Sequence, residues 1–188
     1  ETSGASSPSK NQILTIDATV VRRIKHEDGY VGFAHNPNKF HAKVKKLDWA
    51  LIEAEAMQIT GIILDENWKG AEEYQVLDDL VAWIKRETDG SGYKLLCGYN
   101  VMFDKRFLHF MFKRNPYDHK WTSAFSYRAC DVLQLAQWAY VLGFITLPEN
   151  FKLETIAKHL GVWRKGAHDS SVDVEMTLEV MIRLNDIM

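Results

Sequence analysis

The order of apolar segments predicts a mixed α/β domain. Three segments near the start have the residue pattern typical of strands, at residues 13–21, 30–34 and 39–44. Further along, short apolar strands alternate with segments of helical spacing. The 188 residues fit one domain, spanning 1–188, that would bury roughly 70% of its extended-chain surface. We therefore expect a mixed sheet, rather than a purely parallel one, with helices packed against it.

The first third of the chain is expected to form the antiparallel part of this sheet. Residues 3–11 are rich in Ser, Gly, Pro and Asn and predict a surface loop. The strand at 13–21 is apolar at most positions, so at least one of its faces is buried. Asp28-Gly29 is typical of a hairpin tip that leads into the strand at 30–34.

Helices are expected in the remainder. Residues 94–99 form a short apolar strand between two of them, and residues 127–133 are ambiguous between strand and helix. The predicted helical segments are 54–58, 71–86, 103–113, 133–140, 153–160 and 171–187. The sequence therefore places a strand, a tight turn and a helix in succession around residue 100.

Composition excludes several classes of protein. A hydrophobic fraction of 46% and a charged fraction of 26% are typical of a globular protein, and six Trp with nine Phe argue against disorder. No run approaches the roughly 20 apolar residues that span a bilayer, so we expect no membrane association. Cys97 and Cys130 lie in segments expected to be buried, which favours a reducing compartment over a disulfide framework. We expect an intracellular protein, cytoplasmic or associated with the nucleoid.

The net charge of −2 gives no general attraction for nucleic acid. A polyanionic partner would have to be held by local basic groups and metal ions. Each basic cluster in the sequence is more simply explained as a solvated surface. The clusters are Lys43, Lys45 and Lys46; Lys113 and Arg114; and Arg164 and Lys165.

Asp104 stands where an expected strand gives way to a helix. As a structural residue it would be an N-cap or first-turn acid, which the helix dipole favours by about 0.3–1 kcal/mol. As a functional residue it would point into the crevice at the carboxyl end of the strand, where open α/β sheets place ligands. In that case Asn100 shapes the turn and Phe103 anchors it in the core.

His168 and Asp173 form a second candidate pair. Ser170 and Asp173 have the spacing of a capping box, so the aspartate also has a structural explanation. Five residues at about 100° each place His168 roughly 140° away from Asp173 on a regular helix. The two converge more easily if His168 precedes the helix. A lone histidine at such a position is more often structural or exposed.

Glu1 opens the chain in the run Glu1-Thr2-Ser3-Gly4. By itself, a terminal residue of this kind is explained as a disordered, solvated side chain. Before a polar loop and a buried strand, the same four residues are what remains when a preceding strand ends in Asp-x-Glu.

Together these acids predict a metal site. Carboxylates brought close to one another raise each other's pKa and stay ionised only when cations compensate them. Mg²⁺ prefers such oxygen ligands, and two ions about 3.5–4 Å apart clamp the attacking and leaving oxygens of a phosphoryl displacement. A histidine with a pKa near about 6.5 suits the base that deprotonates the attacking water. The combination predicts a hydrolase of phosphodiesters.

The same motifs, in the same order, resemble those of the DnaQ-like 3′–5′ exonucleases of the DEDDh type. Glu1-Thr2-Ser3-Gly4 matches the last four positions of the family's first motif, Asp-x-Glu-Thr-x-Gly. Further matches are the strand at residues 13–18, the second motif at Asn100 to Asp104, the strand-to-helix run Asp131-Val132-Leu133, and the third motif at His168 and Asp173. The resemblance therefore covers nearly the whole chain.

The resemblance implies a ribonuclease H-like fold with a mixed five-stranded sheet flanked by helices. It implies that Glu1, Asp104 and Asp173 hold two Mg²⁺ ions, which Mn²⁺ can replace, and that His168 is the general base of this catalytic set. The family's first aspartate and the central strand that carries it would lie before Glu1. A fold without that strand would leave unpaired backbone groups, at a cost of roughly several kcal/mol. We therefore expect that the natural polypeptide starts before Glu1.

The resemblance also suggests the substrate. Met57 and Thr60 belong to a segment that lines the terminal-nucleotide pocket in relatives, and Asn100 and Phe107 complete the set of residues expected to contact the 3′-terminal nucleotide. Residues 99–104 and 114–118 look most like the nuclease domain of bacterial exonuclease I, which degrades single-stranded DNA.

We therefore expect a metal-dependent exonuclease that removes nucleoside 5′-monophosphates from a 3′ end. Single-stranded DNA is the favoured substrate, and RNA stays open because contacts to a 2′-hydroxyl are not visible in a sequence. The alternative belongs to a different class of protein. It is a nucleic-acid-binding or proofreading-like module that has the same fold and an incomplete metal site.

Overall fold

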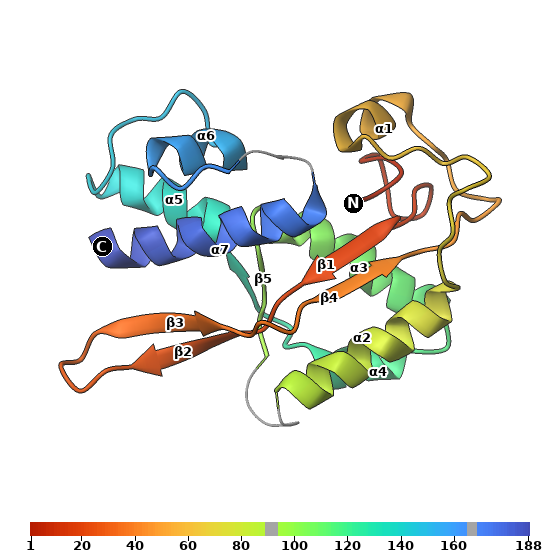
Figure 1. The fold of residues 1–188 in the computed structure, drawn as a ribbon, viewed down its shortest axis with the longest axis horizontal. Helices are drawn as coiled ribbons and strands as arrows, with labels where there is room; N and C mark the ends of the chain where they lie inside the picture. The colour runs from red at the N-terminus through yellow and green to blue at the C-terminus, as the bar shows by residue number, and fades with distance from the viewer. Residues whose placement is uncertain (89–93, 165–168) are drawn as a thin grey trace.

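The computed structural model describes residues 1–88, 94–164 and 169–188, which form six strands and seven helices (Figure 1). The strands are β1 (Thr15–Ala18), β2 (Val21–Lys25), β3 (Val31–His35), β4 (Phe40–Lys43), β5 (Leu96–Gly98) and β6 (Ala129–Asp131). The helices are α1 (Ala54–Thr60), α2 (Glu73–Glu87), α3 (Val101–Arg114), α4 (Asp118–Ala124), α5 (Val132–Val141), α6 (Leu153–His159) and α7 (Ser170–Ile187). None of these helices is long and apolar enough to span a bilayer.

The first four strands form one long antiparallel hairpin with two separate ladders. β1 pairs with β4 and β2 pairs with β3. Between the ladders one arm has two residues, 19–20, and the other has four, 36–39, so the register changes there. Thr19 Oγ1 donates to Asn36 O over 3.0 Å, and Asn36 N donates to Val20 O over 2.8 Å, which holds the offset in place. The prediction of one strand over 13–21 was therefore wrong at its end.

The hairpin tip at Asp28-Gly29 is confirmed. Gly29 has a φ of 89°, a left-handed conformation that residues with a Cβ rarely adopt. Its N–H donates to His26 O over 3.0 Å and closes the turn. The β2–β3 end of the hairpin extends beyond β1 and β4 (Figure 1).

β5 and β6 form the parallel part of the fold, with Leu96 opposite Ala129 and Gly98 opposite Asp131. The ambiguous segment at 127–133 is both strand and helix, since β6 ends at Asp131 and α5 begins at the next residue. Across the described ranges the strands pair only two by two, as β1–β4, β2–β3 and β5–β6. The expected mixture of antiparallel and parallel pairing is confirmed, and the strands form separate ladders because no described strand pairs with both β1 and β5.

Helix α4 was not predicted. It has seven residues, of which only Trp121 and Ala124 are buried, so it is too short for a periodic pattern to stand out. The other helices lie where the apolar spacing placed them, and each end is within two residues of its predicted position. At its start α2 has a capping box between Glu72 and Gln75, which satisfies backbone N–H groups that a helix leaves unpaired.

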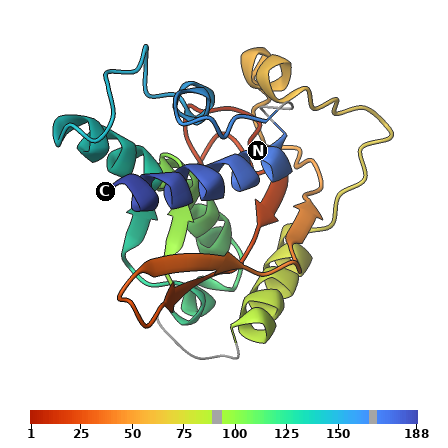
Figure 2. The same ribbon diagram turned by 60° about the vertical axis from the view of Figure 1, so that its left-hand side comes forward.

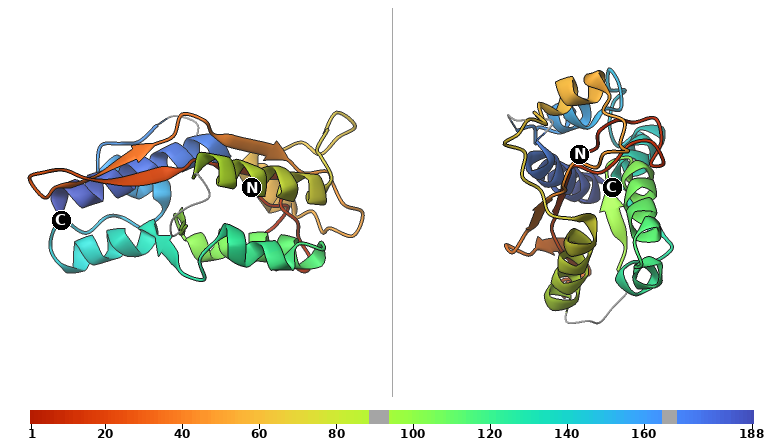
Figure 3. Two further views of the ribbon diagram at one scale, coloured as in Figure 1. Left: turned by 90° about the horizontal axis from the view of Figure 1, so that it is seen from below. Right: turned by 90° about the vertical axis from the view of Figure 1, so that its right-hand side faces the viewer.

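Two clusters of buried side chains hold these elements together. One lies between α2, α3, α4 and the β1–β4 ladder and is rich in aromatic residues, among them Phe107, Phe112 and Trp121. The other joins α5, α6 and α7. Helix α7 runs along the hairpin (Figures 1 and 2), where Asn185 Nδ2 donates to Val31 O over 2.8 Å. Helices α3 and α5 lie on the opposite side of the molecule from the hairpin (Figure 3).

Both cysteines are free thiols, as expected. Cys97 on β5 and Cys130 on β6 face each other in the parallel ladder. Cys97 is exposed and Cys130 is half-buried, so the expectation that both are buried was wrong for Cys97.

Candidate active site

The carboxyl ends of β5 and β6 are tied together by one aspartate. Asp131 Oδ1 accepts the backbone N–H of Asn100 over 2.9 Å and that of Leu133 over 3.1 Å. The second bond caps α5, and the first fixes the turn between β5 and α3. Asn100 itself has a φ of 57°, a left-handed conformation that Asn tolerates better than most residues. Sequence reasoning gave Asp131 no role, although an aspartate directly before an apolar helix is a recognisable N-cap signal.

Asp104 lies in the first turn of α3, just beyond this turn. The residue is exposed, yet the protein atoms around its carboxyl group remove part of its hydration, and this raises its pKa to about 6. The negative charges of Glu1 and Asp131 raise the pKa further, while the N-terminal ammonium group lowers it. Asp104 is a first-turn acid, as the structural explanation has it, and it also lies near two other carboxylates.

Glu1 is held in place and is not a solvated terminal residue. It is half-buried, and its amino group donates to Thr15 O over 2.8 Å and to Thr15 Oγ1 over 3.2 Å. Its carbonyl oxygen accepts the N–H of Leu14 over 2.8 Å. The explanation of Glu1 as a disordered side chain was therefore wrong, because backbone pairing with β1 fixes it.

Asp173 lies in the first turn of α7 and is half-buried. The capping-box explanation was wrong, because Asp169 is the N-cap and its carboxylate accepts the N–H of Ser171 over 2.9 Å. Ser170 instead contacts β1 through its side chain. Its hydroxyl lies 3.3 Å from that of Thr15 and donates to Asp17, so it attaches the start of α7 to β1. The first turn of α7 is thereby placed beside the strand that holds Glu1.

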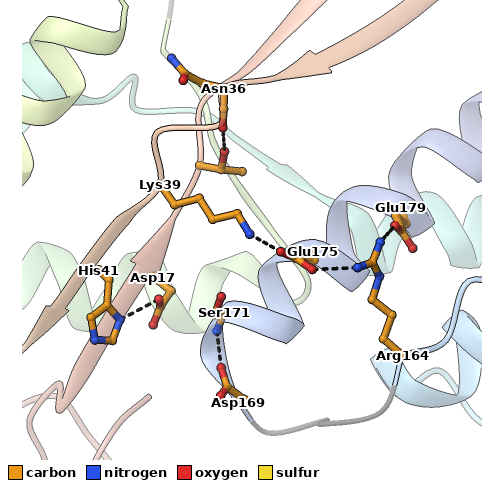
Figure 4. A network of polar contacts seen from close by, with 10 residues as sticks. Asp17, Asn36, Lys39, His41, Arg164, Asp169, Ser171, Glu175 and Glu179 are labelled. Carbon is orange, nitrogen blue, oxygen red and sulfur yellow. Dashed lines mark hydrogen bonds and ion pairs between the residues drawn. The ribbon is translucent and has the colours of Figure 1, made fainter.

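A network of ion pairs further secures α7 on the hairpin (Figure 4). Lys39 pairs with Glu175, and Arg164 pairs with Glu175 at 3.0 Å and with Glu179. Figure 4 also shows the 2.8 Å contact between His41 Nδ1 and Asp17. The chain just before the third motif is therefore fastened to α7 through Arg164. His168, the predicted general base, lies outside the described residues.

Each basic cluster expected from the sequence has one member that is paired with an acid. Arg114 binds Glu73, whose side chain is 7% exposed, with 2.8 Å between Nε and Oε2. Lys45 binds Glu72 over 2.5 Å, and Arg164 is paired as described above. The explanation of these clusters as ordinary structural or surface charge therefore holds for the residues that the structure describes, while Lys165 lies outside them.

The predicted substrate contacts fall into two groups. Met57 and Thr60 are half-buried on α1. Glu53, the residue before this helix, donates its backbone N–H to Ser3 O over 2.8 Å. Asn100 is exposed at the turn. Phe107 is 2% exposed and lies in the core, with its ring 4.8 Å from that of Phe103. The structure thus places Phe107 behind the surface that a nucleotide would touch.

The acids present oxygen donors of the kind that hard divalent cations prefer. Nevertheless, over residues 1–88, 94–164 and 169–188 no three Asp, Glu, His or Cys side chains converge closely enough to hold a metal ion. Like charges repel when no cation compensates them, so the carboxylates have reason to stay apart. The raised pKa of Asp104 comes mainly from the desolvation of its carboxyl group, and the charges of Glu1 and Asp131 add to it. The donor set therefore fits a divalent cation in its chemistry.

An α/β fold that gathers acids at the carboxyl ends of β5 and β6 defines the class of DnaQ-like nucleases. The family model described as Exonuclease (RNase T) matches residues 1–181. The chain belongs to this exonuclease family. None of the curated proteins matches the chain in sequence.

Solved structures share the fold. A structure of exonuclease I superposes with a TM-score of 0.75 at 24% identity and covers 99% of this chain. Exonuclease I of E. coli in complex with a dT13 oligonucleotide has a TM-score of 0.73 at 26% identity and covers 98%. The chain spans only 41% and 39% of those two proteins. The nuclease domain of 3′hExo, a DEDDh family member bound to rAMP, has a TM-score of 0.60 at 16% identity and covers 92% of this chain and 80% of its own.

Proposed function

We propose that this protein is a metal-dependent 3′–5′ exonuclease that hydrolyses single-stranded DNA and releases nucleoside 5′-monophosphates. Glu1, Asp104 and Asp173 hold two divalent cations, Mg²⁺ or Mn²⁺, and His168 takes the proton from the attacking water. When bound, the cations supply positive charge for the attacking and leaving oxygens. Asn100, Met57 and Thr60 orient the 3′-terminal nucleotide.

The observation that carries this proposal is the environment of Asp104. Its carboxyl group is partly desolvated and lies within the field of Glu1 and Asp131, so that its pKa rises to about 6. Acids with raised pKa values that converge from separate elements are typical of functional sites, because a fold gains no stability from gathering them. A cation would relieve this repulsion and be bound by it.

DNA is the preferred substrate because exonuclease I has been solved with a dT13 oligonucleotide. The neighbour 3′hExo is bound to rAMP, so RNA is the competing substrate. The two free thiols, Cys97 and Cys130, support an intracellular, reducing location, in the cytoplasm or at the nucleoid.

The test follows release of the label from 3′-labelled DNA and RNA oligonucleotides while Mg²⁺ or Mn²⁺ is titrated. We expect loss of the 3′ label in single-nucleotide steps, faster for DNA, and no loss with a chelator. Asp104→Asn should abolish release, whereas Asp118→Asn is the matched control because that acid is 62% exposed on α4. His168→Ala should lower the rate and change its pH dependence.

The competing function is a nucleic-acid-binding module with an incomplete metal site. The lack of three converging ligands within the described ranges is the observation in its favour. It predicts that oligonucleotides bind without turnover at any concentration of Mg²⁺ or Mn²⁺. Turnover that Asp104→Asn leaves unchanged would reject the roles assigned to the acids.

A further inference from the structure

Two basic side chains contact Tyr127, in the segment that leads into β6, and a third basic residue, Lys94, lines the pocket beside it. Lys105 of α3 donates to the carbonyl oxygen of Tyr127. Arg128 Nε donates to the Tyr127 hydroxyl over 2.7 Å, and its guanidinium lies 5.2 Å from the centre of the ring. Lys94 belongs to the same group, since its carbonyl oxygen accepts the N–H of Ser126 over 2.8 Å. These residues come from three separate segments, so no basic cluster is visible in the sequence.

Within residues 1–88, 94–164 and 169–188, no acid neutralises the charges of this group. Among the described residues, Lys94, Lys105 and Arg128 form no ion pair, whereas Arg114 and Arg164 both bind glutamates. The whole chain has a net charge of −2, so the positive charge of this group is a local property and not part of a general attraction for anions. The surface therefore has the charge that an anionic partner would complement.

Tyr127 is the most exposed of the large apolar and aromatic side chains that the structure describes, with 74% of its surface accessible. Beside it is an open pocket of about 320 Å³, lined by Lys94 and residues 122–127. This volume is at the lower end of the range for small-molecule sites, roughly 300–1,000 Å³. An exposed ring beside a pocket of this size offers a flat partner both a stacking face and a recess.

We propose that Lys94, Lys105, Tyr127 and Arg128 form an accessory binding surface for single-stranded DNA. A base stacks on Tyr127 at the mouth of the pocket, and the three cations bind the neighbouring phosphates. Proteins that bind single strands combine aromatic stacking with a basic path in this way. The inference rests on the proposed function, because it assigns the surface to the same substrate.

The position of this surface determines which nucleotides of the single-stranded DNA it contacts. Tyr127 lies before the amino end of β6, whereas Asp131 lies at its carboxyl end, so the two are at opposite ends of this strand, up to roughly 13 Å apart at about 3.3 Å per residue. Asp131 is one of the charges that act on Asp104. The surface therefore holds nucleotides away from the 3′ end, and a very short oligonucleotide does not reach it.

The test measures binding of 5′-fluorescein-labelled oligothymidylates by anisotropy, with Asp104→Asn as the parent so that no strand is degraded. Tyr127→Ala should weaken binding of a dodecanucleotide by about fivefold or more, the range of one stacked base, and leave a trinucleotide unaffected. Each of Lys94→Ala, Lys105→Ala and Arg128→Ala should reduce the dependence of log K on log salt by about 0.7. Tyr127→Phe should restore stacking, and Tyr74→Ala is the control, since Tyr74 is 46% exposed on α2.

Several results would overturn the inference. One is an unchanged affinity of Tyr127→Ala for the dodecanucleotide. Another is an equal loss of affinity for the dodecanucleotide and the trinucleotide. A third is a loss of affinity for oligouridylate without a loss for oligothymidylate. Failure of the proposed function is a separate result. In that case wild-type protein degrades no oligonucleotide, while the length-dependent loss of affinity in Tyr127→Ala is still measured.

Discussion

Asp131 Oδ1 accepts the backbone N–H of Asn100 over 2.9 Å, and this bond joins the ends of the two parallel strands next to Asp104. The same oxygen caps α5 through Leu133 N. One carboxylate thus fixes the turn before α3 and the start of α5. Its negative charge also contributes to the raised pKa of Asp104.

Asp131→Ala is therefore expected to lower the free energy of unfolding by about 1–2 kcal/mol, because α5 loses its N-cap. Asp131→Asn keeps an oxygen acceptor and should cost less. Both changes remove one negative charge near Asp104, so both should lower the pKa of that residue. Urea denaturation measures the first effect, and an NMR titration of Asp104 measures the second. Equal stability of Asp131→Ala and the wild type would show that the cap contributes nothing.

Asn100→Ala is expected to destabilise the protein by about 1 kcal/mol, because alanine is strained at a φ of 57°. Asn100→Gly should be close to neutral, since glycine adopts this conformation freely. Thermal unfolding of the two variants separates backbone strain from the loss of the side chain. If Asn100→Gly keeps its stability and still loses exonuclease activity, the amide contacts substrate. If both variants unfold alike, the backbone explanation fails.

The raised pKa of Asp104 has a consequence for stability. The folded state holds this proton up to about pH 6, whereas the unfolded chain releases it near about pH 3.9. Between those values the folded state binds more protons, so stability falls as the pH rises. Because the group is solvent-exposed, we expect a loss on the order of 1 kcal/mol. Without divalent cations, Asp104→Asn should thus be more stable than the wild type at pH 8, and the two should unfold alike below pH 4.

Activity should depend on pH through the same group. Cations bind the ionised carboxylate, so at low Mg²⁺ the rate should rise as the pH increases through about 6. Higher Mg²⁺ should move this midpoint to lower pH, because the cation competes with the proton. Initial rates over pH 4–8 at several concentrations of Mg²⁺ measure the shift. A midpoint that does not respond to Mg²⁺ would assign the titration to another group.

Local signals in the sequence predicted the elements that carry the acids. The tip at Gly29 and the helices that contain Asp104 and Asp173 follow from a turn dipeptide and from apolar spacing, which depend on neighbouring residues only. The break between β1 and β2 was not predictable in this way. It depends on four residues, 36–39, facing two, and such an offset appears only when distant segments pair.

The candidate site was predictable to a similar extent. Ordered motifs named Asp104 and Asp173, and the capping-box explanation of Asp173 was ruled out only by the structure, in which Asp169 caps α7. The burial of Phe107 depends on packing between α2, α3 and α4 and has no signature in the motif. The basic group around Tyr127 is assembled from separated segments, so no run of like charges marks it in the sequence.

The division of the strands into separate ladders affects the geometry of the acids. Glu1 is bonded to β1, Asp104 follows the β5–β6 pair, and Asp173 belongs to α7. Within the described ranges no backbone ladder links β1 with β5. The position of Asp173 relative to Glu1 therefore depends on side-chain hydrogen bonds, in which Ser170 contacts Thr15 and Asp17 of β1. Substitutions between α7 and β1 should alter metal affinity before they alter the circular dichroism of the protein.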